Sequence, residues 1–220
     1  MADYTGKVTV GGPMDVRRLP ALTIAKLAVG PMDNNAYLLR CTVSGEGLLI
    51  DAANEADRLR ELVRFEGPPV SAILTTHQHF DHWQALADTV ADAGAAVYAG
   101  EEDADELPVA VDERLHHGDT IDVGELTLDI IGLRGHTPGS VAVLYHDPEG
   151  SPHLFTGDSL FPGGVGKTWS PEDFRSLIDD VEARVFDVLP DETWFYPGHG
   201  NDSTLGAERP HLGDWRARGW

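Results

Sequence analysis

The chain has 220 residues, of which 41% are hydrophobic and 24% are charged. These values are ordinary for one soluble domain that is large enough to bury a core. The formal net charge of −21 disfavours nucleic acid and anionic membranes as partners. The N-terminus has no apolar h-region, and no apolar run is long enough to cross a bilayer, so we expect neither secretion nor a membrane span.

Cys41 is the single cysteine of the chain. It excludes an internal disulfide and fits a reducing cytoplasm, where we expect the protein to be. Because it stands in the apolar run Tyr37–Cys41, we interpret it as a buried structural thiol.

The first half of the chain predicts β-strands interrupted by two helices. Residues 1–20 show no hydrophobic period, so we expect a loop or a loose edge there. Asn34-Asn35 and Ser44-Gly45 are typical of turns between the first strands. Apolar alternation and short apolar runs predict the strands over residues 22–29, 36–41, 47–51, 70–74 and 95–99.

The two helices are expected on either side of the strand over residues 70–74. Asn54 can N-cap a helix over residues 55–65, with Gly67-Pro68 after its end. The second helix is expected over residues 83–93 and would stop at Gly94.

The second half of the chain opens on an acidic run, Glu101–Glu106, which is typical of a solvated loop. Ser170-Pro171-Glu172-Asp173 then marks a helix start, with a capping serine, a proline in the first turn and carboxylates near the positive end. Residues 201–220 are expected to form a short tail. The strands predicted in this half lie over residues 120–123, 126–133, 141–145, 154–156 and 193–196.

This order of strands and helices predicts an α/β fold. Two sheets packed together with helices outside both would form four layers in a single domain over residues 1–220. Every group of candidate ligands described below follows an apolar run, so these groups would gather at one end of the sandwich.

The most informative stretch is His77-Gln78-His79-Phe80-Asp81-His82. Three imidazoles and a carboxylate within six residues suit a divalent metal of the zinc type, which takes nitrogen and oxygen donors. His77 and His79 alternate, so an extended backbone would direct both side chains to one side. The sequence therefore predicts a metal site on a loop after a buried strand.

Three later stretches complete a pattern that resembles the metallo-β-lactamase superfamily. The string H-x-H-x-D-H is followed by Gly135-His136-Thr137-Pro138-Gly139, then by Thr156-Gly157-Asp158-Ser159, then by Gly198-His199-Gly200. The resemblance covers most of residues 22–200 and is closest to the glyoxalase II (hydroxyacylglutathione hydrolase) branch. It implies an αββα sandwich and a dinuclear metal centre.

Carried onto this chain, the resemblance implies that two metals are bound by seven side chains. Zinc is the metal we expect, with iron or a mixed iron and zinc centre as the alternative. Hydroxide shared by two metals would attack a thioester, or a related ester or lactone, of a small molecule. One metal would take His77, His79 and His136, and the other Asp81, His82 and His199, while Asp158 would bridge them. Asp81 and Asp158 are the candidate catalytic residues.

The remaining histidines have no counterpart in this pattern. We interpret His116, His117, His146, His153 and His211 as surface or structural residues.

The resemblance to glyoxalase II also implies a substrate-binding lysine. The loop Pro162–Trp169 is glycine-rich and places Lys167 at the family's basic position, where it would hold an anionic thiol carrier. The tyrosine that follows the last histidine in that branch is missing, since His199 precedes Gly200-Asn201. The branch's C-terminal helical extension has no counterpart among residues 200–220. Glutathione as the carrier therefore stays open.

Two other functions compete with hydrolysis. A mononuclear iron persulfide dioxygenase would use His77, His136 and Asp158 alone, but this chain has Val165 where that branch's loop has a cysteine. A non-catalytic metal-binding protein is disfavoured, because a ligand set that leaves positions open for water is what catalysis needs.

Overall fold

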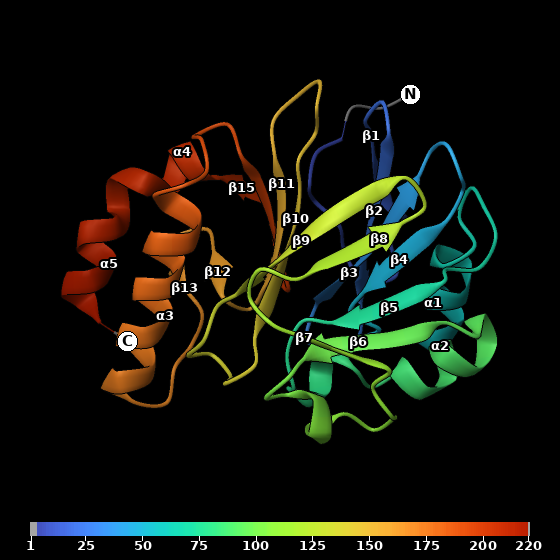
Figure 1. Cartoon of the computed structure of the whole chain (residues 1–220), viewed down its shortest axis with the longest axis horizontal. Helices are drawn as coiled ribbons and strands as arrows, with labels where there is room; N and C mark the ends of the chain where they lie inside the picture. The colour runs from blue at the N-terminus through green and yellow to red at the C-terminus, as the bar shows by residue number, and fades with distance from the viewer. Residues whose placement is uncertain (1–3, 220) are drawn as a thin grey trace.

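Two packed β-sheets with helices outside each make up the computed structural model, which describes residues 4–219 (Figure 1). Residues 1–3 of the predicted N-terminal loop and residue 220 of the predicted tail lie outside the described residues. The helices α1 (Ala56–Leu62) and α2 (Leu86–Ala93) cover one sheet. The other sheet is covered by α3 (Pro171–Val181), α4 (Leu205–Glu208) and α5 (Leu212–Arg218). The predicted four-layer αββα sandwich is confirmed.

The first sheet has seven strands in chain order, β1 to β7. From β4 onward neighbouring strands pair in parallel, and α1 and α2 carry the chain back between β4, β5 and β6. The carboxyl ends of these strands therefore meet at one edge of the sheet. The strands are β1 (Asp15–Arg18), β2 (Leu22–Val29), β3 (Asn34–Cys41), β4 (Gly47–Ile50), β5 (Ala72–Thr75), β6 (Ala96–Gly100) and β7 (Glu113–Leu115).

The second sheet has six strands in the order β15-β14-β11-β10-β9-β8. Its strands β11 and β14 pair in parallel, so their carboxyl ends also share an edge. The strands are β8 (Thr120–Val123), β9 (Leu126–Gly132), β10 (Val141–Tyr145), β11 (His153–Gly157), β14 (Trp194–Pro197) and β15 (Ser203–Thr204). A small hairpin of β12 (Leu160–Phe161) and β13 (Gly164–Val165) follows β11.

Side chains of β2 alternate between two hydrophobic cores. Leu22 and Ile24 pack between the two sheets, whereas Ala25, Leu27 and Val29 pack in the core that contains residues of α1 and α2. All eight residues of β2 are buried, because a sheet covers one face of the strand and helices cover the other.

Several local predictions are confirmed. The bounds of β2, β8 and β10 are those expected from the apolar pattern. Ser170 caps α3 by accepting a hydrogen bond from the backbone N–H of Asp173 (3.1 Å), and α2 ends at Gly94, whose φ is 68°. Cys41 is buried.

Two predictions about turns and caps are wrong. Asn34 and Asn35 begin β3 and are buried, because the Asn35 side chain donates to the carbonyls of Pro197 and Gly200 at 2.9 and 3.0 Å. Asn54 does not cap α1: the N-cap residue is Glu55, with φ at 53°, and the Asn54 side chain accepts from the Glu55 N–H.

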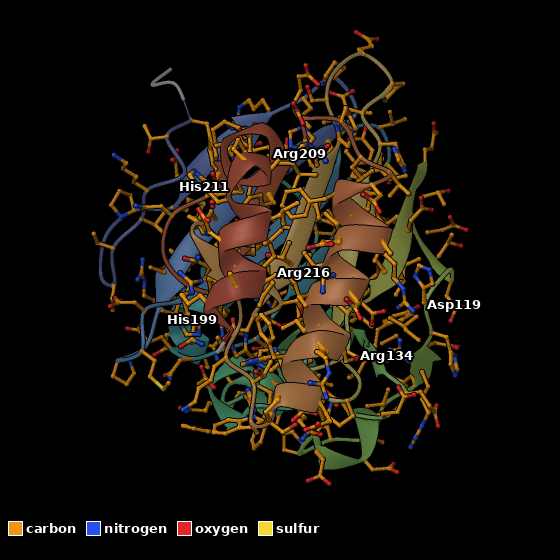
Figure 2. The ribbon with its side chains drawn as sticks, turned by 90° about the vertical axis from the view of Figure 1, so that its left-hand side faces the viewer. Asp119, Arg134, His199, Arg209, His211 and Arg216 are labelled. Carbon is orange, nitrogen blue, oxygen red and sulfur yellow. The ribbon has the colours of Figure 1, made fainter. Side chains whose placement is uncertain are left out.

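The predicted N-terminal edge contains a strand, and the predicted C-terminal tail is largely helical. Residues 15–18 form β1, an edge strand that pairs with β2. The predicted tail contains β15, α4, the short 3₁₀ helix η4 (Arg209–His211) and α5. Trp215 of α5 is buried, and Arg216 lies between α5 and α3, where it contacts Asp179 and Glu182 at 2.6 and 2.8 Å (Figure 2). In the part of the chain that is described, no helix is long and apolar enough to cross a membrane.

His153 is a buried structural histidine, whereas His116, His117, His146 and His211 are exposed. The Nδ1 atom of His153 accepts a hydrogen bond from the Tyr196 hydroxyl at 2.8 Å, and Arg17 donates to that hydroxyl at 3.0 Å. Burial, with repulsion from Arg17, lowers the pKa of His153 to about 4. The imidazole is therefore neutral in the folded protein at neutral pH.

We predict that His153 destabilises the fold as the pH decreases. The unfolded chain takes up this proton near pH 6.5 and the folded chain only near pH 4, so stability is full above about 6.5 and falls between these values. At pH 5 the loss is roughly 2 kcal/mol. Urea unfolding at pH 7 and pH 5 measures it. The His153→Gln variant should lose less stability than wild type, and His211→Gln should match wild type; equal losses in all three would contradict the prediction.

Candidate metal centre

The seven candidate ligands lie at the edge where the parallel strands of both sheets end. His77 and His79 follow β5, and Asp81 and His82 belong to the 3₁₀ helix η1 (Phe80–His82). His136 lies between β9 and β10. Asp158 follows β11 and His199 follows β14. The first sheet thus carries four of these side chains and the second sheet carries three.

These seven side chains converge in two groups. The donor atoms of His77, His79 and His136 lie within 4.8 Å of one another, and so do those of Asp81, His82 and His199. A third set at the same separation, His77, His82 and Asp158, links the two groups. Asp158 lies between the groups. Its Oδ1 is 3.4 Å from His82 Nε2, and its Oδ2 is 3.7 Å from His136 Nε2 and 3.5 Å from His199 Nε2.

Hydrogen bonds on the outer ring nitrogens orient several of these imidazoles. His82 Nδ1 donates to Asp51 at 2.8 Å, His136 Nδ1 to the Lys167 carbonyl at 2.7 Å and His199 Nδ1 to the Met32 carbonyl at 2.9 Å. Each bond leaves Nε2 facing the centre. Such outer partners fix the tautomer and the ring direction of metal-binding histidines.

Asp51 is a buried residue beside the candidate ligands, and the sequence pattern did not indicate its contacts with them. It follows β4 with φ at 60°, and its carboxylate accepts bonds from His82 and from the N–H and hydroxyl of Thr76 at 2.7 and 2.9 Å. The Thr76 hydroxyl in turn lies 3.0 Å from His77 Nδ1. Asp51 therefore orients one histidine of each group. Its position at the carboxyl end of the strand predicted over residues 47–51 is the signal that could identify it.

Asn34 is a second residue that was missed, because the Asn34-Asn35 pair was predicted as a turn. Its side-chain amide donates to Asp81 Oδ2 at 2.8 Å and lies 3.4 Å from His199 Nε2. It holds the Asp81 carboxylate in the second group.

The charges of the centre are arranged for a cation. Burial opposes ionisation of Asp158, yet His82 and His199 hold the pKa of that carboxyl well below its usual range. Burial also lowers the pKa of His77. Burial would lower the pKa of His199 too, but its bonds to Asp158 and Asp81 raise it to about 9. A divalent ion would replace the positive charge that protonated imidazoles supply here.

Three atoms at the centre are buried without a hydrogen-bond partner among the described residues: His77 Nε2, His82 Nε2 and Asp158 Oδ1. Buried polar atoms are almost always paired, so these three require a partner such as a metal ion. Five imidazoles and two carboxylates are also the donors that zinc-type cations take. The residues present therefore fit divalent metal ions.

A cleft of about 430 Å³ opens beside His136, and its lining also includes Arg134, Trp169 and Asp173. Figure 2 shows Arg134 on one side of the helix pair α3 and α5 and His199 on the other.

Lys167 is not among the converging side chains. It is exposed, and its Nζ lies 4.5 Å from the centre of the Trp169 ring, which is itself 6.3 Å from the His79 ring.

Residues 29–199 match the family model described as the metallo-beta-lactamase superfamily. A curated relative, the hydroxyacylglutathione hydrolase of Erythrobacter litoralis, is 36% identical over 169 residues, which are 76% of this chain and 63% of the relative. The chain thus spans less than two thirds of that relative's length.

Two solved structures have the same fold. TTHA1623 in a di-iron-bound form is 33% identical, with a TM-score of 0.69 over 84% of this chain and 96% of that one. ETHE1 from Myxococcus xanthus is 25% identical, with a TM-score of 0.76 over 88% of this chain and 84% of that one. The family match and the donor geometry together identify a divalent metal site, and the chain belongs to the metallo-beta-lactamase superfamily.

Proposed function

We propose that the protein is a dinuclear metallohydrolase of the glyoxalase II type, acting on a thioester or a related ester or lactone of a small molecule. The observation that carries this proposal is the pair of donor groups with one carboxylate, Asp158, between them. Relatives named hydroxyacylglutathione hydrolase, at 31–37% identity, support the same class of reaction.

In this proposal His77, His79 and His136 would hold one ion, Asp81, His82 and His199 would hold the other, and Asp158, which lies between the groups, would contribute to both. Two bound ions would lower the pKa of a shared water and polarise the substrate carbonyl. The chain's own residues prepare for this. Asp158 and Asp81 stay ionised at neutral pH because their pKa values are held low, and Asp51 and Asn34 fix the direction of His82 and Asp81.

Zinc is the metal that we propose, because it takes imidazole nitrogens and carboxylate oxygens and keeps positions open for water at catalytic sites. Iron or a mixed centre is the alternative, since the similar protein TTHA1623 was solved in a di-iron-bound form. The likeness to ETHE1 favours, in part, a second candidate function, a mononuclear iron persulfide dioxygenase. That function would leave Asp81, His82 and His199 without a metal, so we rank it second.

Exposed apolar side chains beside the donors support an organic substrate. Met32, Phe80 and Trp169 are 48%, 56% and 66% exposed. The Met32 carbonyl binds His199, Phe80 stands between His79 and Asp81, and the Trp169 ring lies near His79. Apolar side chains next to a few polar groups are typical of sites for organic ligands. Lys167, over Trp169, would hold an anionic group of the thiol carrier.

The net charge and the single cysteine support what we propose for the partners and the compartment of the protein. A net charge of −21 disfavours nucleic acid and anionic membranes as partners. A single buried cysteine suits the reducing cytoplasm in which we propose that the enzyme works.

Metal content and turnover test the proposal together. The purified protein should hold two metals per chain by elemental analysis, hydrolyse a thioester and lose that activity when a chelator removes the metal. Restoring zinc should restore turnover. One iron and no zinc per chain, with oxygen consumption on a persulfide substrate, would replace the hydrolase with the dioxygenase.

The Asp81→Ala variant tests the second donor group. It should deplete one of the two ions more than the other and lower kcat by orders of magnitude, because Asp81 contacts both His82 and His199 (3.5 and 3.4 Å). Metal content and kcat of the same preparation provide the readout. A variant that keeps both ions and normal turnover would show that Asp81 is not a ligand.

The Lys167→Ala variant tests the substrate contact. An exposed charge contact that is equal in the ground and transition states is worth about 1 kcal/mol, so KM should rise roughly fivefold with kcat unchanged. The rise should occur for a thioester of an anionic thiol and be absent for a neutral one. Lys7→Ala removes another exposed lysine and is the control. Equal KM changes on both substrates would mean that Lys167 binds no carrier.

A further inference from the structure

Asp103 contradicts the prediction that the acidic run Glu101–Glu106 is a solvated loop. Its exposed fraction is 0%, whereas Glu106 in the same run is exposed. Three hydrogen bonds satisfy the buried carboxylate. Oδ2 accepts from the Gln78 N–H at 2.9 Å and from the Thr137 hydroxyl at 2.5 Å, and Oδ1 accepts from the Gly139 N–H at 2.7 Å.

These donors come from two loops that carry ligands of the same proposed metal. Gln78 stands between His77 and His79 on the loop after β5 of the first sheet. Thr137 directly follows His136 on the loop between β9 and β10 of the second sheet. The carboxylate of Asp103 therefore connects the two backbones that must bring His77, His79 and His136 together.

The connection leaves little room for adjustment. A Cβ placed on Gly100, at the end of β6, would lie 1.9 Å from the Gly139 carbonyl oxygen, and a Cβ on Gly139 would lie 2.5 Å from the Asp103 nitrogen. The His136 loop therefore packs backbone to backbone against the start of the acidic run. Close packing of this kind transmits strain, so we expect a change in the hydrogen bonds of Asp103 to be felt in the His136 loop.

The chemistry of the three bonds requires a carboxylate. All three groups are neutral donors, so both oxygens of the side chain must accept. Burying an ionised group in this way is costly compared with burying an apolar side chain. An amide cannot replace it. Two N–H groups point at different oxygens, so either orientation of an asparagine would set its NH₂ against a backbone N–H.

We propose that Asp103 is a positioning residue that sets the distance between His136 and the pair His77 and His79. It thereby controls the affinity with which these three histidines bind their metal ion. This inference rests on the proposed dinuclear site. It predicts a selective effect, because among its hydrogen bonds in the described chain Asp103 has none to the loops that carry Asp158 and His199, and its bond to the first sheet is to Gln78, which stands between His77 and His79.

Cobalt titration of the metal-free full-length protein tests the proposal, with absorption and calorimetry as readouts. In Asp103→Asn one of the two ions should bind at least tenfold more weakly with an altered visible spectrum, and the other should bind within twofold of wild type. Glu106→Gln removes an exposed charge from the same run and should match wild type. Thr137→Val removes one of the three donors and should weaken the same ion by a smaller factor.

Each outcome has a distinct meaning. If wild type fails to bind two ions, the proposed dinuclear site fails before the role of Asp103 is tested. If Asp103→Asn binds both ions as wild type does, or loses both equally, Asp103 is not a positioning residue of one metal group. Should Asp103→Asn not fold, Thr137→Val decides in the same way, with a selective loss supporting the proposal and an equal or absent loss overturning it.

Discussion

Two backbone hydrogen bonds join the sheets at the edge where the ligands gather, and the centre depends on them. Val141 N–H donates to the Thr76 carbonyl at 2.9 Å, and Asn35 N–H donates to the Gly198 carbonyl at 2.7 Å. Each bond connects a strand of one sheet to a ligand loop of the other. Because the seven donors are divided between the sheets, the donor distances follow from how firmly these edges are joined.

Close backbone approach strengthens this junction. A Cβ on Gly198 would lie 2.2 Å from Asp158 Oδ1 and 2.7 Å from His82 Cε1, so only glycine fits beside the donors. The buried pair Lys26 and Asp202 (2.6 Å) adds a further tie, since Lys26 also donates to the Gly200 carbonyl at 2.8 Å, next to His199. A buried ion pair adds little net stability. Its value here is that it holds the His199 loop and the N-terminal segment, at Gly6, against β2.

The sequence predicted the parts of this arrangement that depend on local pattern. Apolar alternation marked β2, β8 and β10, and the serine cap marked α3. Ligand spacing marked the stretch from His77 to His82, and the resemblance to the superfamily supplied His136, Asp158 and His199. It did not predict the residues whose role depends on partners far along the chain. Asp103 looks like part of a solvated acidic run until Gly139 and Thr137, more than thirty residues away, surround it. Asn35 is typical of a turn in the sequence, but in the structure its side-chain amide donates to the distant Pro197 carbonyl. For the same reason α5, whose Trp215 packs against Phe186, could not be predicted from its own short stretch.

The central claim is that the joined edges of the two sheets create two adjacent metal positions. Anomalous diffraction from crystals of the zinc-loaded protein measures this most directly. We predict two peaks about 3.5–4 Å apart, as in other two-metal sites. One peak should be surrounded by His77, His79 and His136, and the other by Asp81, His82 and His199. A single peak at full metal loading, or a peak outside these residues, would contradict the account.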